Sequence, residues 1–138
     1  MKKVTLLFMA SAISSLSFAQ EIRESEVPEA VKSAMKKNYS SVKVTTWEKE
    51  DGYYEAGFTV DKIKNSVLLD DKGTIKESEK EIPVGDLPKG VAEYVKKHHP
   101  SEKIIGAAKI TDSKGVITYE AEIKGKDLFF DTNGKFIK

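Results

Sequence analysis

The sequence of 138 residues contains no cysteine. This absence excludes disulfides, thiolate nucleophiles, cysteine-ligated metals and a lipid-modified N-terminal cysteine. Histidine is almost as scarce, because the only two, His98 and His99, are adjacent. Consecutive residues of a helix point about 100° apart, so these two side chains cannot easily share one metal ion. We interpret them as a polar helix end and predict no metal site and no catalytic histidine.

The chain also lacks an excess of charge of one sign. It has 23 Lys and Arg against 22 Asp and Glu, for a formal net charge of +1, and both signs are mixed along the chain. Proteins that bind nucleic acid normally carry a clustered basic face, so we expect no nucleic-acid partner. No glycine-rich phosphate loop and no nucleophile elbow is present. We therefore predict a protein that is not an enzyme and has no cofactor.

Long apolar runs are absent except near the N-terminus. Two lysines precede the mostly apolar stretch Val4 to Ile13, and Ser17-Phe18-Ala19 then fits the small-x-small rule for cleavage. The run is too short to anchor the chain in a bilayer. We predict that residues 1–19 form a signal peptide cleaved near Ala19-Gln20, and that the mature protein is periplasmic or secreted without a membrane anchor.

The mature chain contains the same order of motifs twice. A proline opens a helix at Pro28 and again at Pro88, and strands follow each helix. The triplet Tyr54-Glu55-Ala56 recurs as Tyr119-Glu120-Ala121. We predict an α+β fold, a tandem repeat of a helix followed by a four-stranded antiparallel sheet, with repeats at 20–83 and 84–138. The helices should cover one sheet face and leave the other open. The expected strands are Val42–Glu50, Tyr53–Val60, Ser66–Leu69, Thr74–Glu81, Lys103–Thr111, Val116–Lys124, Leu128–Asp131 and a short final strand.

One of these strands, Thr74 to Glu81, is unusually polar. Its charged residues are Lys76, Glu77, Glu79, Lys80 and Glu81. Such charges discourage edge-to-edge association, so we predict that this strand lies at a sheet edge.

Two stretches vaguely resemble calcium loops, Asp70-Asp71-Lys72-Gly73 and Asp131-Thr132-Asn133-Gly134. Neither supplies the further oxygen ligands and the distal glutamate that a calcium loop needs. A type I turn with Asp first and Gly in a left-handed conformation explains both, and we predict such turns.

Several carboxylates lie close together in the predicted strands and could be paired for acid–base work. The acids are Glu48, Glu50, Glu55, Glu120 and Glu122, and they are interleaved with Lys49, Lys109 and Lys124. We interpret them as a solvated sheet face with cross-strand charge pairs.

The single tryptophan, Trp47, is the most informative aromatic residue. A two-residue turn at Asp51-Gly52 would place Trp47 opposite Ala56, on the apolar face of the next strand. A three-residue turn would place it opposite Glu55, with Tyr53 on the same side. Core packing is the default interpretation. If the side chain is exposed, Trp47 and Tyr53 are the candidate partner-binding residues, since Trp and Tyr dominate binding hot spots.

These motifs together resemble a known family. The helix starts Val27-Pro28 and Leu87-Pro88, the Tyr-Glu-Ala strands, and the Asp-x-x-Gly turns after Leu68-Leu69 and Phe129-Phe130 look like the PepSY-like family of exported bacterial proteins, grouped by fold with beta-lactamase-inhibitor proteins. The resemblance implies a duplicated helix-plus-four-strand unit and a non-enzymatic role. True beta-lactamase inhibitors of this fold are disulfide-bonded, so the lack of cysteine argues against a beta-lactamase target.

The sequence therefore favours an exported binding module. We expect it to dock an envelope or secreted protein, or a peptide, through an open sheet face or edge, and thereby to inhibit or regulate that partner. The alternative is a carrier of a small molecule or ion that uses a pocket between helix and sheet.

Overall fold

The computed structural model describes residues 19–138. The predicted signal peptide, apart from Ala19, lies outside these described residues and stays a prediction. Two helices are present in the described part, α1 (Glu29–Asn38) and α2 (Lys89–His98), with short 3-10 turns at Glu24–Glu26 and Val84–Asp86. The strands are β1 (Gln20–Glu21), β2 (Thr46–Glu50), β3 (Tyr53–Val60), β4 (Ile63–Leu69), β5 (Ile75–Glu81), β6 (Gly106–Asp112), β7 (Ile117–Ile123) and β8 (Lys126–Phe130).

The strands of residues 19–138 form one antiparallel sheet in chain order, β1 to β8. The α+β class, with helices and an antiparallel sheet, is confirmed, but the two halves do not form separate four-stranded sheets. Four strands follow α1, whereas three strands and an isolated bridge between Phe130 and Phe136 follow α2. The halves merge because β5 pairs with β6 over five residue pairs, from Glu77↔Asp112 to Glu81↔Ala108.

The polar strand β5 lies in the middle of this sheet, between β4 and β6, so the prediction that it lies at an edge is wrong. Side-chain alternation sorts its charges between the two faces of the sheet. Lys80 lies opposite Lys109 on one face, while Glu77, Glu79 and Glu81 lie on the other.

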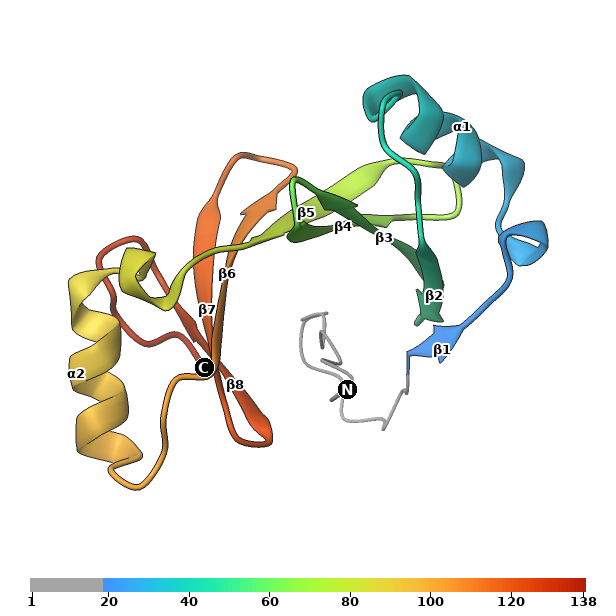
Figure 1. Ribbon diagram of the computed structural model, residues 1–138. Helices are drawn as coiled ribbons and strands as arrows, with labels where there is room; N and C mark the ends of the chain where they lie inside the picture. The colour runs from blue at the N-terminus through green and yellow to red at the C-terminus, as the bar shows by residue number, and fades with distance from the viewer. Residues whose placement is uncertain (1–18) are drawn as a thin grey trace.

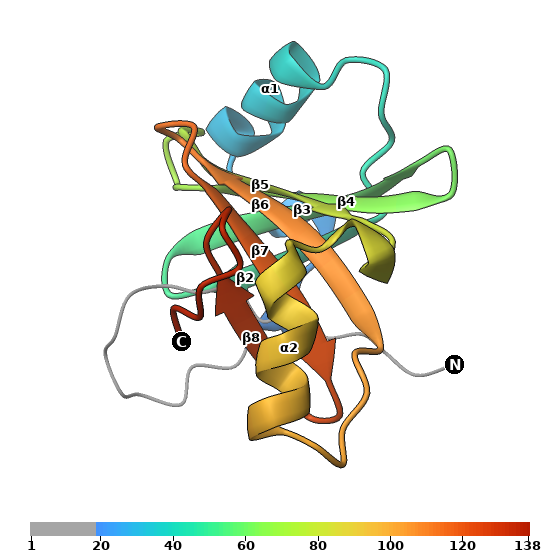
Figure 2. The same cartoon turned by 90° about the vertical axis from the view of Figure 1, so that its left-hand side faces the viewer.

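Both helices pack on the same face of the sheet, at opposite ends of it. In Figure 1 the sheet bends like an arch with α1 and α2 on its outer side, and Figure 2 shows α2 lying across β6, β7 and β8. Val31 and Met35 of α1 pack on a cluster of Trp47, Tyr54, Ala56, Phe58, Val67 and Leu69. Val91 and Val95 of α2 pack on Ala121, Ile123, Leu128 and Phe130. Each half therefore has its own core, and the helix-free face is left open.

A turn glycine touches the start of the helix in each half. Gly73 and Gly134 both have positive φ, at 82° and 78°. A Cβ on Gly73 would collide with the carbonyl oxygen of Ala30 in α1, and a Cβ on Gly134 would lie 2.8 Å from the backbone nitrogen of Gly90 in α2. Only glycine lets the turn approach the helix so closely, and this equivalent contact supports a duplicated unit.

The aspartate turns have the predicted form. Asp70 accepts hydrogen bonds from the backbone N–H groups of Lys72 and Thr74, and Asp131 does the same for Asn133 and Lys135. Asp112 caps a third turn in the same way. The Asp side chains thus accept hydrogen bonds from backbone N–H groups of the turns.

Candidate functional site

The candidate site is the helix-free face of the sheet, which we call the open face. Directly paired residues of neighbouring strands point to the same face, so the register identifies its members. One row runs Glu48, Glu55, Leu68, Glu77, Asp112. The next runs Thr46, Gly57, Ser66, Glu79, Ile110, Thr118. Two further rows run Glu81, Ala108, Glu120, Phe129 and Gly106, Glu122, Asp127.

This register separates the two aromatic candidates. The Asp51-Gly52 turn is the two-residue form, so Trp47 lies opposite Ala56 and Tyr53 opposite Glu50. Trp47 is 6% exposed and belongs to the core under α1, so it does not have the exposed position that a binding anchor requires. Tyr53 is half-buried and lines a small pocket on the open face. Of the two residues, only Tyr53 keeps a place in a candidate site, and a binding role for it stays a prediction.

Acids lie opposite acids on the open face. Glu48 pairs with Glu21 on one side and Glu55 on the other, and Glu122 pairs with Asp127. Directly opposite like charges destabilise an antiparallel pair. Within residues 19–138, the ion pairs Arg23–Glu26, Lys32–Glu29 and Lys76–Asp70 involve none of these facing acids. For Glu48, Glu55 and Glu122 the interpretation as cross-strand charge pairs is therefore wrong, because each lies opposite another acid.

The pKa values of the central carboxyls are strongly raised. Burial, reinforced by the charge of Glu48, raises the pKa of Glu55 to about 8. Burial and the neighbouring Asp127 raise the pKa of Glu120 to about 8. For Glu79, burial and then the charge of Glu120 raise the pKa to about 9. At neutral pH these three groups hold their protons, because burial and the neighbouring acids disfavour a carboxylate there.

Glu79 lies deepest of these acids. It is 4% exposed, as is Ser66, its partner across β4 and β5. Oε1 of Glu79 is buried without a hydrogen-bond partner in the described structure. Oγ of Ser66 is also buried without a partner in hydrogen-bonding geometry, although the Ser66 side chain is near enough to the Glu55 carboxyl to lower the pKa of Glu55. A buried polar atom without a partner costs about 1–3 kcal/mol, so its presence requires an explanation.

Both atoms belong to residues that line a pocket of about 100 Å³ on the open face. Glu79 and Glu81 of β5 line it on one side, and Glu120 and Glu122 of β7 on the other. Gly106 and Ala108 of β6 lie between them. The small side chains of β6 thus leave a hollow between two acidic strands.

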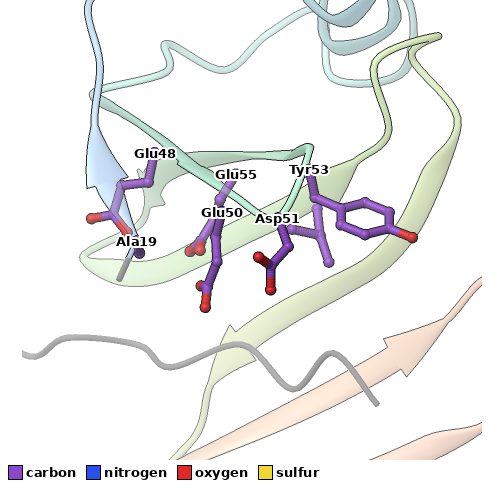
Figure 3. Close-up of a pocket in the computed structure, with 7 residues that line it drawn as sticks. Ala19, Glu48, Glu50, Asp51, Tyr53 and Glu55 are labelled. Atoms are coloured by element: carbon purple, nitrogen blue, oxygen red, sulfur yellow. The ribbon is translucent and has the colours of Figure 1, made fainter. Parts of the chain in front are cut away.

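A second, smaller hollow lies at the β2–β3 hairpin. Figure 3 shows Glu48, Glu50, Asp51 and Glu55 projecting toward the same side of this hairpin, with the ring of Tyr53 beside them. Its volume is about 20 Å³. A third hollow follows β2, β3 and β4, lined by Thr46, Glu48, Glu55, Lys64, Ser66 and five further residues. None of these three hollows has a lining residue from α1 or α2, so they offer no support for a carrier pocket between helix and sheet.

His98 ends α2 in contact with an aromatic ring. His98 stacks on Tyr94 with ring centroids 4.3 Å apart. Within residues 19–138, no three His, Asp or Glu side chains are grouped so that they could hold a metal ion. In the same range, no helix has the length and apolarity needed to cross a membrane.

Sequence reasoning missed the acidic open face, although a signal for it was present. Glu48 and Glu50, then Glu77, Glu79 and Glu81, then Glu120 and Glu122 recur at a period of two. A period of two places each set on one side of its strand. The intervening lysines therefore belong to the other face and cannot neutralise these acids.

The comparisons with known proteins agree with this architecture. A model of the family described as "Putative beta-lactamase-inhibitor-like, PepSY-like" matches residues 16–77 and residues 52–138. The matches overlap, so the predicted boundary between 83 and 84 stays a prediction. No curated protein sequence matches the chain significantly.

Several solved structures share the fold. A protein from Bacteroides eggerthii, described among "putative periplasmic proteins", superimposes with a TM-score of 0.70 at 15% identity, over 81% of this chain and 86% of that one. A DUF2874 family protein from Bacteroides uniformis gives 0.69 at 18% identity, over 80% and 86%. A BLIP-like protein from Bacteroides fragilis gives 0.57 at 20%, over 80% and 84%. At these identities the likeness establishes the fold alone.

Proposed function

Since the chain belongs to the PepSY-like, beta-lactamase-inhibitor-like family, we propose that it is an exported, non-enzymatic module that docks a partner protein through the open face. The partner surface is a positively charged segment of an envelope or secreted protein. Docking occupies that segment and thereby inhibits or regulates the partner. Export follows from the predicted signal peptide, and the periplasm is the proposed location in a cell with two membranes.

One observation carries this proposal: a helix-free sheet face on which acid lies opposite acid. The Glu21–Glu48 and Glu122–Asp127 contacts reduce the stability of the isolated protein, and the raised pKa of Glu55 reflects the cost of a further charge beside Glu48. A partner that brings positive charge would relieve this repulsion, so it would bind by charge complementarity. A partner that buried only apolar surface would leave it in place. The proposal therefore commits to a basic partner segment.

The test compares capture of a partner by three forms of the mature protein. The wild type, an open-face variant (Glu55→Lys with Glu77→Lys) and a helix-side variant (Lys36→Glu with Lys96→Glu) are immobilised and exposed to envelope extract. We expect the wild type and the helix-side variant to retain the same protein, and the open-face variant to lose it. The retained protein should elute when salt is raised from 0.1 to 0.5 M, because salt screens exposed charge pairs.

Equal capture by the open-face variant would contradict the proposal. Capture that 0.5 M salt leaves intact would contradict the basic character of the partner. Circular dichroism of all three forms must match, so that loss of capture reports the surface and not the fold.

A further inference from the structure

We propose that the hollow between β5 and β7 receives the ammonium or guanidinium group of one lysine or arginine side chain of the docked partner. We call this hollow the anchor pocket, defined by Ser66, Glu79, Gly106, Ala108 and Glu120. The inference rests on the proposed function and adds a specific anchor to it.

The size of the anchor pocket restricts the ligand. Its volume is about 100 Å³, whereas pockets for drug-sized ligands measure roughly 300–1,000 Å³. It has room for the head group of a side chain. The space exists because Ala108, opposite Glu120, and Gly106, opposite Glu122, are small. A larger residue at either position would occupy it.

The unpartnered polar atoms give the pocket its chemistry. Oε1 of Glu79 and Oγ of Ser66 are buried and lack hydrogen-bond partners in residues 19–138, and both residues line the pocket. An ammonium carries three N–H donors and a guanidinium five, and neither carries an acceptor. Such a group would donate to oxygens that the fold leaves unused.

The charges around the pocket favour an organic cation. Four of its lining residues are acids, Glu79, Glu81, Glu120 and Glu122, and one, the exposed Lys64, is basic. The acids are not clustered tightly enough to hold a metal ion. A charged side chain with several donors can instead reach separate oxygens on β5 and β7.

Binding should be coupled to proton release. Glu79 is influenced by Glu77 on its own strand, Glu55 on β3, Glu120 on β7 and Asp127 on β8; Ser66 on β4 and Ile110 on β6 are its direct neighbours. Burial, and then these acids, raise its pKa, so the free pocket holds protons at neutral pH. An incoming cation favours the carboxylate, and the proton leaves. Affinity should therefore increase as pH rises toward 9, where a lysine side chain is still charged.

The experiment uses a synthetic peptide, acetyl-Lys-Thr-Lys-Thr-Lys-Thr-Lys-amide, titrated calorimetrically into the mature protein at pH 6 and pH 9. Its matched control replaces every lysine by acetyl-lysine, which removes the charge. The protein variants are Glu79→Gln, Ala108→Leu, and Glu48→Gln, which removes an open-face acid that does not line the pocket.

At pH 9 we expect Glu79→Gln and Ala108→Leu each to weaken binding of the lysine peptide at least tenfold, and Glu48→Gln to weaken it less than threefold. Wild-type affinity should be at least tenfold higher at pH 9 than at pH 6, and Glu79→Gln should lose most of this difference. Titrations in two buffers with different ionisation enthalpies should detect proton release by the wild type.

The outcomes separate the two proposals. If the wild type binds the lysine peptide and all three variants weaken it equally, the anchor pocket is wrong and docking through the open face stands. If the wild type binds the acetylated peptide as well as the charged one, or binds neither, a basic partner segment is wrong too. Because Ala108→Leu adds volume in a sheet, its thermal melt is recorded, and Glu79→Gln carries the test if that variant unfolds.

Discussion

Glu79 lies directly opposite Ser66 in the register of β5 and β4, and an oxygen of each side chain is buried without a hydrogen-bond partner. Such a pair in the middle of a sheet lowers the stability of the isolated protein. It lies where two acidic strands leave a hollow, so the same atoms that weaken the fold form the proposed anchor pocket.

The first prediction concerns stability and pH. In the folded protein the pKa values of Glu55 and Glu120 are about 8 and that of Glu79 is about 9, against an ordinary value of 4.5. Between pH 4.5 and 9 the folded state therefore binds more protons than the unfolded state, and stability falls as pH rises. Each carboxyl contributes up to about 1.4 kcal/mol per pH unit in this window. Thermal melts at pH 5, 7 and 9 should show a decreasing Tm, and a Tm that rises from pH 5 to pH 9 would contradict the raised pKa values.

The second prediction isolates Glu79. Replacing it with Gln removes the charge that must otherwise form in a buried site at alkaline pH. We expect Glu79→Gln to raise the free energy of unfolding at pH 9 by several kcal/mol, up to about 6 kcal/mol for a pKa raised from 4.5 to about 9, and to change it little at pH 5. Urea unfolding at both pH values measures the difference. Glu50→Gln, on the open face but at the β2–β3 turn, serves as the control. An equal gain in stability at pH 9 from Glu50→Gln would contradict a specific effect of the buried Glu79 carboxyl.

The third prediction concerns the turn glycines. Gly73, Gly115 and Gly134 all have φ near 80°, but only Gly73 and Gly134 press against a helix, while a Cβ on Gly115 would meet open space. Replacement of Gly115 by Ala should cost about 1–2 kcal/mol for the left-handed backbone. Gly73→Ala and Gly134→Ala should cost a further 1–3 kcal/mol, roughly, for the collision with the helix. Equal losses at all three positions in urea unfolding would contradict the helix contact.

The fourth prediction separates Trp47 from Tyr53. Trp47→Ala empties part of the core under α1 and should destabilise the protein by about 3–5 kcal/mol. Tyr53→Ala should change stability far less, since the ring is half-buried at the hairpin. If Tyr53 contacts the partner, its replacement should weaken capture without lowering Tm. A Tm loss from Tyr53→Ala as large as that from Trp47→Ala would overturn this assignment.

Much of the local structure could be predicted because it depends on neighbouring residues. Pro28 and Pro88 precede helices that begin at Glu29 and Lys89, and Asp51-Gly52 makes a two-residue hairpin. That hairpin decides the position of Trp47, which the sequence left open between two registers. A difference of one residue in the turn moves every side chain of the strand to the other face.

The arrangement of the two halves could not be predicted in the same way. Nothing in Thr74 to Glu81 specifies a partner strand, and its charges are those of an edge strand. Its central position in the sheet depends on pairing with β6, which begins at Gly106. In that pairing Lys80 lies opposite Lys109. The open face was hard to predict for a related reason, because acids and lysines alternate along the strands and only the side-chain alternation assigns them to opposite faces.

The pairing of β5 with β6 also sets the separation between the two halves of the sheet, β1 to β5 with α1 and β6 to β8 with α2. Two units joined by a flexible linker would sample many separations, and binding one partner with both units would cost conformational entropy. The β5–β6 pairing instead holds the two halves at one separation before any partner binds. A partner that contacts both halves, as proposed, would therefore have to match that one separation.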